Sequence, residues 1–378
     1  DGGAGDDTLI GGAGDDTLIS VSGNNTLDGG ANNSGGDWVY YNQKLVALNL
    51  NMKNVDSSGY AIANFGSETD KLKEIENIRG TIKADFIGGN DQNNTLDAFM
   101  GDGNTLIGSG GDDVLLGSSD GNDTFKAGIL QSDGSLIDGN DGNNTIDGKF
   151  GTNNTLDYSA YASSRTIKVD MGALDGTGNS TVTISDGTTD KIKNIQNIIG
   201  SAGNDTISGD DNNNTLKGGA GNDTFYAGNG VDTLSYVNSN SGITYTLVDN
   251  TSDINGNFGT VTSSTDGNDL LKAHFERLIA TNYADTIDLR NTVAGNSTIL
   301  GYGGADTIYS STLYGDTIFG GDANDLIYAN GGNNSYYGGN ATIDASGVIT
   351  GSSGSGDDRV SYIFATSGIT SIIRSFAH

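Results

Sequence analysis

A perfect nine-residue repeat constrains this chain more than any other feature. Residues 2–10 and 11–19 both read GGAGDDTLI, and four consecutive units hold one phase over residues 200–235, as GSAGNDTIS, GDDNNNTLK, GGAGNDTFY and AGNGVDTLS. Self-similarity at a fixed period is typical of repeat proteins, in which each unit packs on its neighbours. We therefore interpret the chain as one discontinuous solenoid rather than a set of globular domains.

Each unit contains a glycine-rich half, then Asp, then a triplet with one large apolar residue. Gly readily adopts the positive φ that a tight turn with exposed carbonyls needs, and the triplet fits a short strand with one side chain pointing inward. Two units then form an 18-residue coil with two strands and two turns. Stacked coils predict two parallel sheets around a thin core that includes Leu9, Leu18, Leu216, Phe225 and Leu234.

Three related β-rich segments interrupt the repeats. Each opens on an aromatic strand in which Tyr41, Tyr158 and Tyr236 hold equivalent places, so we expect these tyrosines in the core. Each ends in a closing segment, DKLKEIENIRG, DKIKNIQNIIG or DLLKAHFERLIA, whose apolar spacing favours a single helical turn or a corner of the coil. The predicted order is repeats 1–36, insert 37–79, degenerate repeats 80–156, insert 157–199, repeats 200–234, insert 235–279, repeat-like units 280–358, and at 359–378 the start of a fourth insert or a C-terminal cap.

The charge balance limits the partners of the chain. It has 48 Asp and Glu against 18 Lys and Arg, for a formal charge of -30. Nucleic acid and anionic membranes are unfavourable partners for such a chain, and no apolar run is long enough to span a bilayer. The carboxylates recur at regular intervals rather than in runs, which indicates bound cations.

The Asp of each turn is the candidate ligand. Calcium takes about six to eight oxygen ligands, and a glycine-rich turn offers carbonyls beside a carboxylate. Turns 18 residues apart stack, so Asp205 and Asp223 should face one gap and share ions there, and Asp306 and Asp325 are related in the same way with one inserted residue. The same motif position holds the other candidates: Asp7, Asp16, Asp85, Asp113, Asp123, Asp232, Asp285, Asp316 and Asp358.

These tandem units resemble the RTX, or hemolysin-type, calcium-binding repeats of bacterial proteins exported by type I secretion. The copies at 2–19 and 200–235 carry the likeness. The resemblance implies an all-β fold, a right-handed parallel β-roll solenoid with stacked nonapeptide coils that holds several Ca²⁺ ions and is disordered without them. It also implies an extracellular location at the bacterial cell surface.

Several units depart from the pattern by carrying Asn in place of the motif Asp. Asn lends an oxygen but no charge, so such a turn either binds calcium weakly or replaces the ion with a stacked amide ladder. Alternate units lie on opposite edges of the roll, so Asn214 between Asp205 and Asp223 favours the hypothesis that calcium occupies one edge more fully. The units with Asn are those of Asn25, Asn94, Asn144, Asn154, Asn214 and Asn334.

Nothing in the sequence favours catalysis. Ser119 lies in GSSDG, which matches the G-x-S-x-G elbow of esterases but lacks its strand-to-helix context. His274, one of two His, is interpreted as a packing variant of its closing segment. We therefore expect a non-enzymatic surface protein, a surface-layer or fibre subunit or an adhesin scaffold, that self-associates into a lattice or filament. The alternative is a calcium-binding accessory region of a secreted toxin or hydrolase whose catalytic domain is absent from this chain.

Overall fold

The computed structural model describes residues 1–248, 256–291, 295–339, 341–343, 349–351, 359–361 and 372–374. All regular elements in these ranges are β-strands, and no helix long and apolar enough to cross a membrane occurs among them. The chain divides into two compact units: Asp1–Arg165 with Ala173–Ile198, and Thr166–Gly172 with Ile199–His378. The predicted ligand Asp358 and most of residues 359–378 lie outside the described residues.

Successive nonapeptides of the first unit alternate between two parallel sheets. β1 (Thr8–Ala13) pairs with β3 (Thr26–Ala31), which places Leu9 opposite Leu27, 18 residues later. β2 (Thr17–Ile19) pairs in the same way with β4 (Trp38–Tyr40) in the second sheet. One coil therefore contributes one strand to each sheet, which confirms the predicted parallel β-roll.

The predicted core residues occupy the middle of these short strands. Leu216, Phe225 and Leu234 are fully buried, and Leu18 is nearly so. Leu9 is only partly buried, because β1 pairs with a described strand on one side alone.

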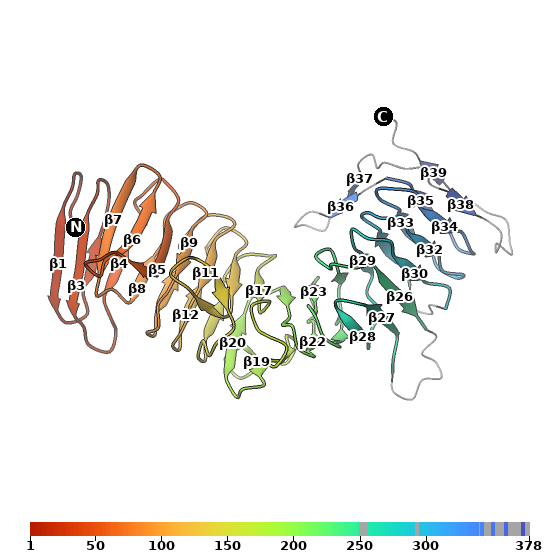
Figure 1. Cartoon of the computed structure of the whole chain (residues 1–378), viewed down its shortest axis with the longest axis horizontal. Helices are drawn as coiled ribbons and strands as arrows, with labels where there is room; N and C mark the ends of the chain where they lie inside the picture. Colours follow the sequence, from red (N-terminus) through yellow and green to blue (C-terminus); the bar gives the residue numbers. More distant parts are fainter. Residues whose placement is uncertain are drawn as a thin grey trace. The chain divides into compact units, whose positions relative to one another are not determined.

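The first insert widens one sheet and not the other. β7 (Glu68–Lys73) pairs parallel with β3, β5 (Asn49–Val55) pairs parallel with β9 (Phe86–Gly88), and β6 (Ala61–Phe65) lies antiparallel between β5 and β7. Figure 1 shows these strands side by side. In the second sheet β4 pairs directly with β8 (Asn77–Arg79). The insert is thus a three-stranded meander built into the stack of coils.

The rest of the first unit continues both sheets. β8 pairs with β10 and then β12, β16 and β20, with β19 antiparallel to β20, while β9 pairs with β11, β13 and β17. β14 and β15 form an antiparallel hairpin. The bounds are β10 Thr95–Asp97, β11 Thr105–Ile107, β12 Val114–Leu116, β13 Thr124–Lys126, β14 Ile129–Leu130, β15 Leu136–Ile137, β16 Thr145–Asp147, β17 Thr155–Asp157, β19 Ser180–Ile184, β20 Thr189–Lys193 and β21 Asn197–Ile199.

The second unit repeats this plan. One row of pairings runs β18–β22–β24–β28–β27–β26–β30–β32–β34–β38, and another runs from β23 through β25, β29, β31, β33 and β35 to β39. β26, β27 and β28 form the meander of the third insert. The bounds are β18 Ile167–Asp170, β22 Thr206–Ser208, β23 Thr215–Lys217, β24 Thr224–Tyr226, β25 Thr233–Ser235, β26 Ile243–Leu247, β27 Gly259–Ser263, β28 Gly267–Leu271, β29 Arg277–Ile279, β30 Thr286–Asp288, β31 Thr298–Leu300, β32 Thr307–Tyr309, β33 Thr317–Phe319, β34 Leu326–Tyr328, β35 Ser335–Tyr337, β36 Ala341–Ile343, β37 Ile349–Gly351, β38 Arg359–Ser361 and β39 Ile372–Arg374.

The closing segments are corners, and the helical alternative is wrong. In the first insert the segment runs from β7 through a bend at Glu74 into β8. Glu74 and its equivalent Asn194 adopt positive φ values of 51° and 56°. Leu72, Ile75 and Ile78 are buried on both sides of the corner, which explains an apolar spacing of three without a helix.

Candidate metal centres

The candidate Asp side chains form a ladder along each edge of the coils. The backbone N–H of Asp205 donates to Oδ1 of Asp223 at 2.8 Å, and that of Asp306 donates to Oδ1 of Asp325 at 2.9 Å. The stacking predicted for both pairs is therefore confirmed. Asn serves equally well, because the N–H of Asp7 donates to Oδ1 of Asn25 at 2.9 Å. The turns differ only in what the second side-chain atom, Oδ2 or Nδ2, contacts.

In the first class, which we call open turns, the Asp Oδ2 is buried and has no hydrogen-bond partner. Burying a carboxylate oxygen without a donor disfavours its charged form. Desolvation accordingly raises the pKa of Asp223 and Asp306 to about 9 and that of Asp113 to about 8. Such oxygens call for a proton or a cation. The open turns are those of Asp7, Asp16, Asp37, Asp113, Asp223, Asp232 and Asp306.

Backbone carbonyls converge on the same oxygens. A Cβ on Gly301 would lie 2.1 Å from the carbonyl oxygen of Gly320 in the next coil and 2.5 Å from Oδ2 of Asp306. The first glycine of the unit is thus required because a carboxylate and a carbonyl crowd its Cα. The second and fourth residues take positive φ, as at Gly219 (100°) and Gly221 (115°). Oxygen atoms that face one another without a hydrogen suit a hard cation such as calcium.

No group of three or more His, Cys, Asp or Glu side chains placed to hold a metal occurs in the described part of the chain. A cation at an open turn would therefore draw most of its ligands from backbone carbonyls. Calcium accepts such ligands readily, so the residues present fit this ion.

In the second class, the capped turns, the protein itself satisfies the carboxylate. Ser201 donates its N–H to Oδ2 of Asp205 at 2.6 Å and its hydroxyl to Oδ1 at 2.9 Å. These donors partly offset desolvation, so the pKa of Asp205 rises only to about 6. Equivalent Ser or Thr donors cap four more predicted ligands: Asp85, Asp123, Asp285 and Asp316. The structure thus separates the predicted ligands into two chemical classes.

In the third class, the amide turns, the Asn amide nitrogen stands where the Asp turns have Oδ2 and donates to the turn carbonyls. Nδ2 of Asn154 donates to the carbonyls of Gly148 at 2.9 Å and Gly151 at 3.2 Å. Nδ2 of Asn334 donates to Gly331 O at 2.8 Å. These contacts support the amide ladder over weak calcium binding. Asn104 belongs to the same class, with Nδ2 2.7 Å from Gly101 O, and the sequence pattern missed it because its unit is irregular.

The inserts supply ladder residues that the motif does not reveal. Asp190 and Asp269, the first residues of two closing segments, accept backbone N–H groups from Asn144 and Asp223. Their second oxygens accept the hydroxyls of Tyr158 at 2.7 Å and Tyr236 at 2.5 Å. Tyr41, Tyr158 and Tyr236 are buried, as predicted, and Tyr158 and Tyr236 also cap these two carboxylates. The repeated first Asp of the closing segment was the signal available in the sequence.

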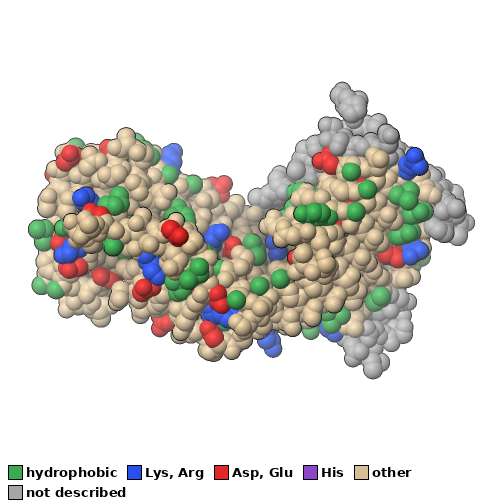
Figure 2. Space-filling view, viewed as in Figure 1, with side chains coloured by type: hydrophobic (Ala, Val, Ile, Leu, Met, Phe, Trp, Pro, Cys, Tyr) green, Lys and Arg blue, Asp and Glu red, His purple; other side chains and the backbone are tan. Residues whose placement is uncertain are grey.

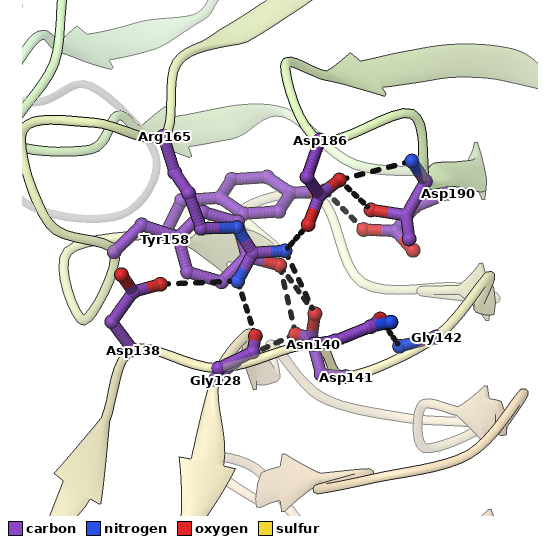
Figure 3. A network of polar contacts seen from close by, with 12 residues as sticks. Gly128, Asp138, Asn140, Asp141, Gly142, Tyr158, Arg165, Asp186 and Asp190 are labelled. Atoms are coloured by element: carbon purple, nitrogen blue, oxygen red, sulfur yellow. Dashed lines mark hydrogen bonds and ion pairs between the residues drawn. The ribbon is translucent and has the colours of Figure 1, made fainter.

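In the second insert, the side chain of Arg165 lies among several carboxylates (Figure 3). The guanidinium of Arg165 lies 3.1 Å from Asp138, 3.5 Å from Asp141 and 2.7 Å from Asp186, and it stacks over the ring of Tyr161. A guanidinium in contact with several carboxylates neutralises them without a metal. At this site the positive charge of Arg165 balances the carboxylates in place of a metal ion.

Open turns are unevenly distributed within each unit. In the first unit Asp16, Asp37 and Asp113 precede strands of the second sheet, whereas only Asp7 precedes a strand of the first. In the second unit Asp223 and Asp306 lie on one edge and Asp232 on the other. This distribution supports fuller occupancy of one edge, among the described residues.

The ladder also hides much of the negative charge. Asp113, Asp223 and Asp306 are each 1% exposed. The acidic side chains visible in Figure 2 are dispersed over the surface rather than gathered in one patch. Neutralisation is therefore needed inside the turns more than at the surface.

Ser119 and His274, the residues considered for catalysis, lie beside groups that stabilise the fold. Ser119 is exposed in the turn between β12 and β13, next to the capping Ser118. His274 is half-buried, with Nε2 3.1 Å from the hydroxyl of Ser297 and Nδ1 3.4 Å from Glu276. Both contacts fit the packing role expected for His274.

The turn classes coincide with a known repeat. The sequence model of the RTX calcium-binding nonapeptide repeat (4 copies) matches residues 1–34, 100–129, 135–154, 199–234, 292–312 and 310–341. No curated protein matches the chain. Six of the seven open turns have their Asp within the matched segments, Asp37 being the exception. The chain therefore contains RTX calcium-binding nonapeptide repeats, a structural repeat that binds calcium.

Proposed function

We propose that this chain is a secreted structural protein whose fold is completed by calcium at the open turns. The observation that carries the proposal is the buried, donor-free Oδ2 of residues such as Asp223 and Asp306. Extracellular calcium modules bind with dissociation constants of about 10⁻⁴ to 10⁻³ M, so such sites are empty in the cytosol and filled outside. Calcium would then act as a location-dependent folding switch.

The protein prepares these turns without the ion. At Asp113, Asp223, Asp232 and Asp306 a ladder N–H donates to Oδ1, which holds the carboxylate in place and leaves Oδ2 free for the neighbouring carbonyls and an ion. Bound calcium would supply the positive charge that these oxygens lack. Each site filled to a hundred times its dissociation constant would add about 2.7 kcal/mol to the stability of the folded state. The proposed ligands are Asp7, Asp16, Asp113, Asp223, Asp232 and Asp306, with Asp325 at the same ladder position.

The capped turns of Asp85, Asp123, Asp205, Asp285 and Asp316 are proposed to take up calcium weakly or not at all. Their oxygens already accept N–H and hydroxyl donors, which a cation would have to displace. The chain would thus be a composite scaffold, in part held by ions and in part by its own donors.

We further propose that the folded solenoid assembles at the cell surface, as a surface-layer or fibre subunit or as an adhesin scaffold. This proposal is supported by the composition of the fold. Stacked coils and inserts account for nearly all described residues, as is typical of a scaffold. An accessory region of a secreted toxin or hydrolase would use the same calcium chemistry without self-association, so assembly separates the two.

The test follows folding and assembly of the full chain with calcium, with equimolar magnesium and with chelator. Circular dichroism should report β structure only with calcium, because magnesium demands a smaller octahedral site. Electron microscopy should then show ordered lattices or filaments. Dispersed, folded particles in calcium would overturn assembly alone, whereas equal folding in chelator would overturn the calcium switch.

A further inference from the structure

Each insert begins and ends at a stacked pair of turn residues, which we call its junction. The pairs are Asp37 with Glu76, Asn154 with Gln196, and Asp232 with Glu276. In all three the backbone N–H of the first residue donates to a side-chain oxygen of the second at 2.8 Å. The geometry is shared, but the first and third junctions hold two carboxylates and the second holds two amides.

The second junction satisfies itself. Asn194 presents its carbonyl from a left-handed conformation, with φ of 56°. Nδ2 of Asn154 donates to that carbonyl at 2.9 Å and to the carbonyl of Gly148 at the same distance. The amide nitrogen of Asn154 thus meets carbonyl oxygens, and its position needs no ion.

The first junction has the same backbone arrangement as the second, but it lacks the side-chain N–H donor that Asn154 supplies there. Glu74 takes the place of Asn194 and is also left-handed, at φ 51°. A Cβ on Gly29 would lie 2.1 Å from the carbonyl oxygen of Glu74 and 2.5 Å from Oδ2 of Asp37. The equivalent point at Gly148 lies 2.4 Å from Asn194 O and 2.3 Å from Nδ2 of Asn154. An oxygen therefore faces the carbonyl where the second junction has an N–H.

This oxygen is unsatisfied in the interior. Asp37 is fully buried, and its Oδ2 has no hydrogen-bond partner. Glu76 brings a second carboxylate against the same residue. Glu, unlike Asn, is an unusual residue at positive φ, and strained backbone of this kind clusters at functional positions, ligand clamps among them.

We propose that the first junction binds a calcium ion through Asp37, Glu76 and the backbone carbonyl of Glu74. The proposal extends the proposed function to a site outside the nonapeptide motif, since the matched segment ends at residue 34. Its closing half has no glycine-rich turn, so a motif search passes over it. The third junction differs, because its Glu276 also contacts His274.

The chain offers a matched pair of variants. The double variant D37N/E76Q copies the amides of the second junction and keeps the oxygens that accept the ladder N–H groups. Counted by equilibrium dialysis at saturating calcium, it should bind one ion fewer than the parent. The reverse variant N154D/Q196E should bind one ion more.

Trp38 provides a local probe. It is the only Trp in the chain and directly follows Asp37, so terbium bound at the junction can be excited selectively through it. Asp16 is in the adjacent turn, and the backbone N–H of Trp38 donates to the backbone carbonyl of Asp16 at 2.9 Å. The measurement is therefore made in a D16N background. Emission sensitised by Trp38 should be present in D16N and lost in D16N/D37N/E76Q.

An unchanged ion count in folded D37N/E76Q, or persistent emission in the triple variant, would overturn the proposal. If D37N/E76Q does not fold, N154D/Q196E decides, and no gained ion there would count against it. A parent chain that binds no calcium at all would instead refute the proposed function.

Discussion

Two neighbouring turns on one edge of the second unit differ by a single motif residue. Residues 200–205 read GSAGND and residues 218–223 read GGAGND. They stack directly, yet Ser201 caps Asp205, whereas Oδ2 of Asp223 is buried without a partner. Desolvation raises the pKa of Asp205 to about 6 and that of Asp223 to about 9. The donors of Ser201 offset desolvation at Asp205, whereas Asp223 has only the ladder N–H of Asp205 and is also raised by the charge of Asp269. One side chain thus decides whether a turn satisfies its Asp or leaves it for a cation.

Calcium removal should have the largest effect on folding and should separate the turn of Asp223 from the turn of Asp205. We expect the chelated chain to lose most of its β signal at neutral pH, because without the ion the buried open-turn carboxylates must take up protons to fold, which costs free energy at this pH. At limiting calcium, hydrogen exchange should reach the amides of 218–226 before those of 200–208. Equal protection of both segments throughout a calcium titration would contradict the division into open and capped turns.

The pH dependence of the ion-free chain should be the next largest effect. The folded-state pKa of Asp113, Asp223 and Asp306 is raised to about 8 or 9, so the folded state binds more protons than the unfolded one. The stabilisation is complete below the unfolded pKa of about 4 and is lost as pH rises toward 9.

Circular dichroism in chelator should therefore show more β structure at pH 5 than at pH 8. Saturating calcium at pH 8 should restore stability, and calcium affinity should fall as pH is lowered because the ion competes with protons. A chelated chain that is more stable at pH 8 would show that the buried carboxylates are not protonated.

Substituting the two stacked Asp residues should give opposite results. D223N should remove one ion and with it about 2.7 kcal/mol of calcium-dependent stability at a hundredfold excess over the dissociation constant. Its new amide can donate to the turn carbonyls, as Asn154 does, so the ion-free chain should not lose stability.

D205N should leave the ion count unchanged and lower the unfolding free energy of both the calcium-bound and the ion-free chain by about 1–3 kcal/mol. The reason is that the new amide group would face the N–H of Ser201 and leave that N–H unpaired. Calorimetric titration gives the count, and denaturation in calcium at neutral pH and in chelator at pH 5 gives the stabilities. Loss of an ion in D205N would place Asp205 among the calcium ligands.

Exchanging the residue that distinguishes the turns should give the smallest effect. S201G removes one hydroxyl donor, which should cost the ion-free chain about 0.5–1.5 kcal/mol and allow the turn to gain an ion. The conservative S201T variant should retain the cap, as Thr81 does for Asp85. An unchanged ion count in S201G would mean that turn geometry, rather than the hydroxyl, excludes calcium.

Much of the architecture could be predicted from the chain. Constant phase between nonapeptides gave the coil length, the two parallel sheets and the ladder neighbours, since these depend on local turn chemistry that repeats. The inserts were located but their topology was not: β7 pairs with β3 across 45 residues (Thr26 with Lys71), and no local pattern reports which strands of a meander meet the stack.

The sequence by itself determined that Asp or Asn stands at every turn of the regular units, because either side chain can accept the ladder N–H. Only the tertiary structure decided what the second atom meets: a hydroxyl at Asp205, a carbonyl at Asn154, or a buried space lined with oxygens at Asp223 and Asp37. The reason is that a ligand set made mostly of backbone carbonyls depends on the φ values of the turn and on the position of the neighbouring coil. A single nonapeptide determines neither of them.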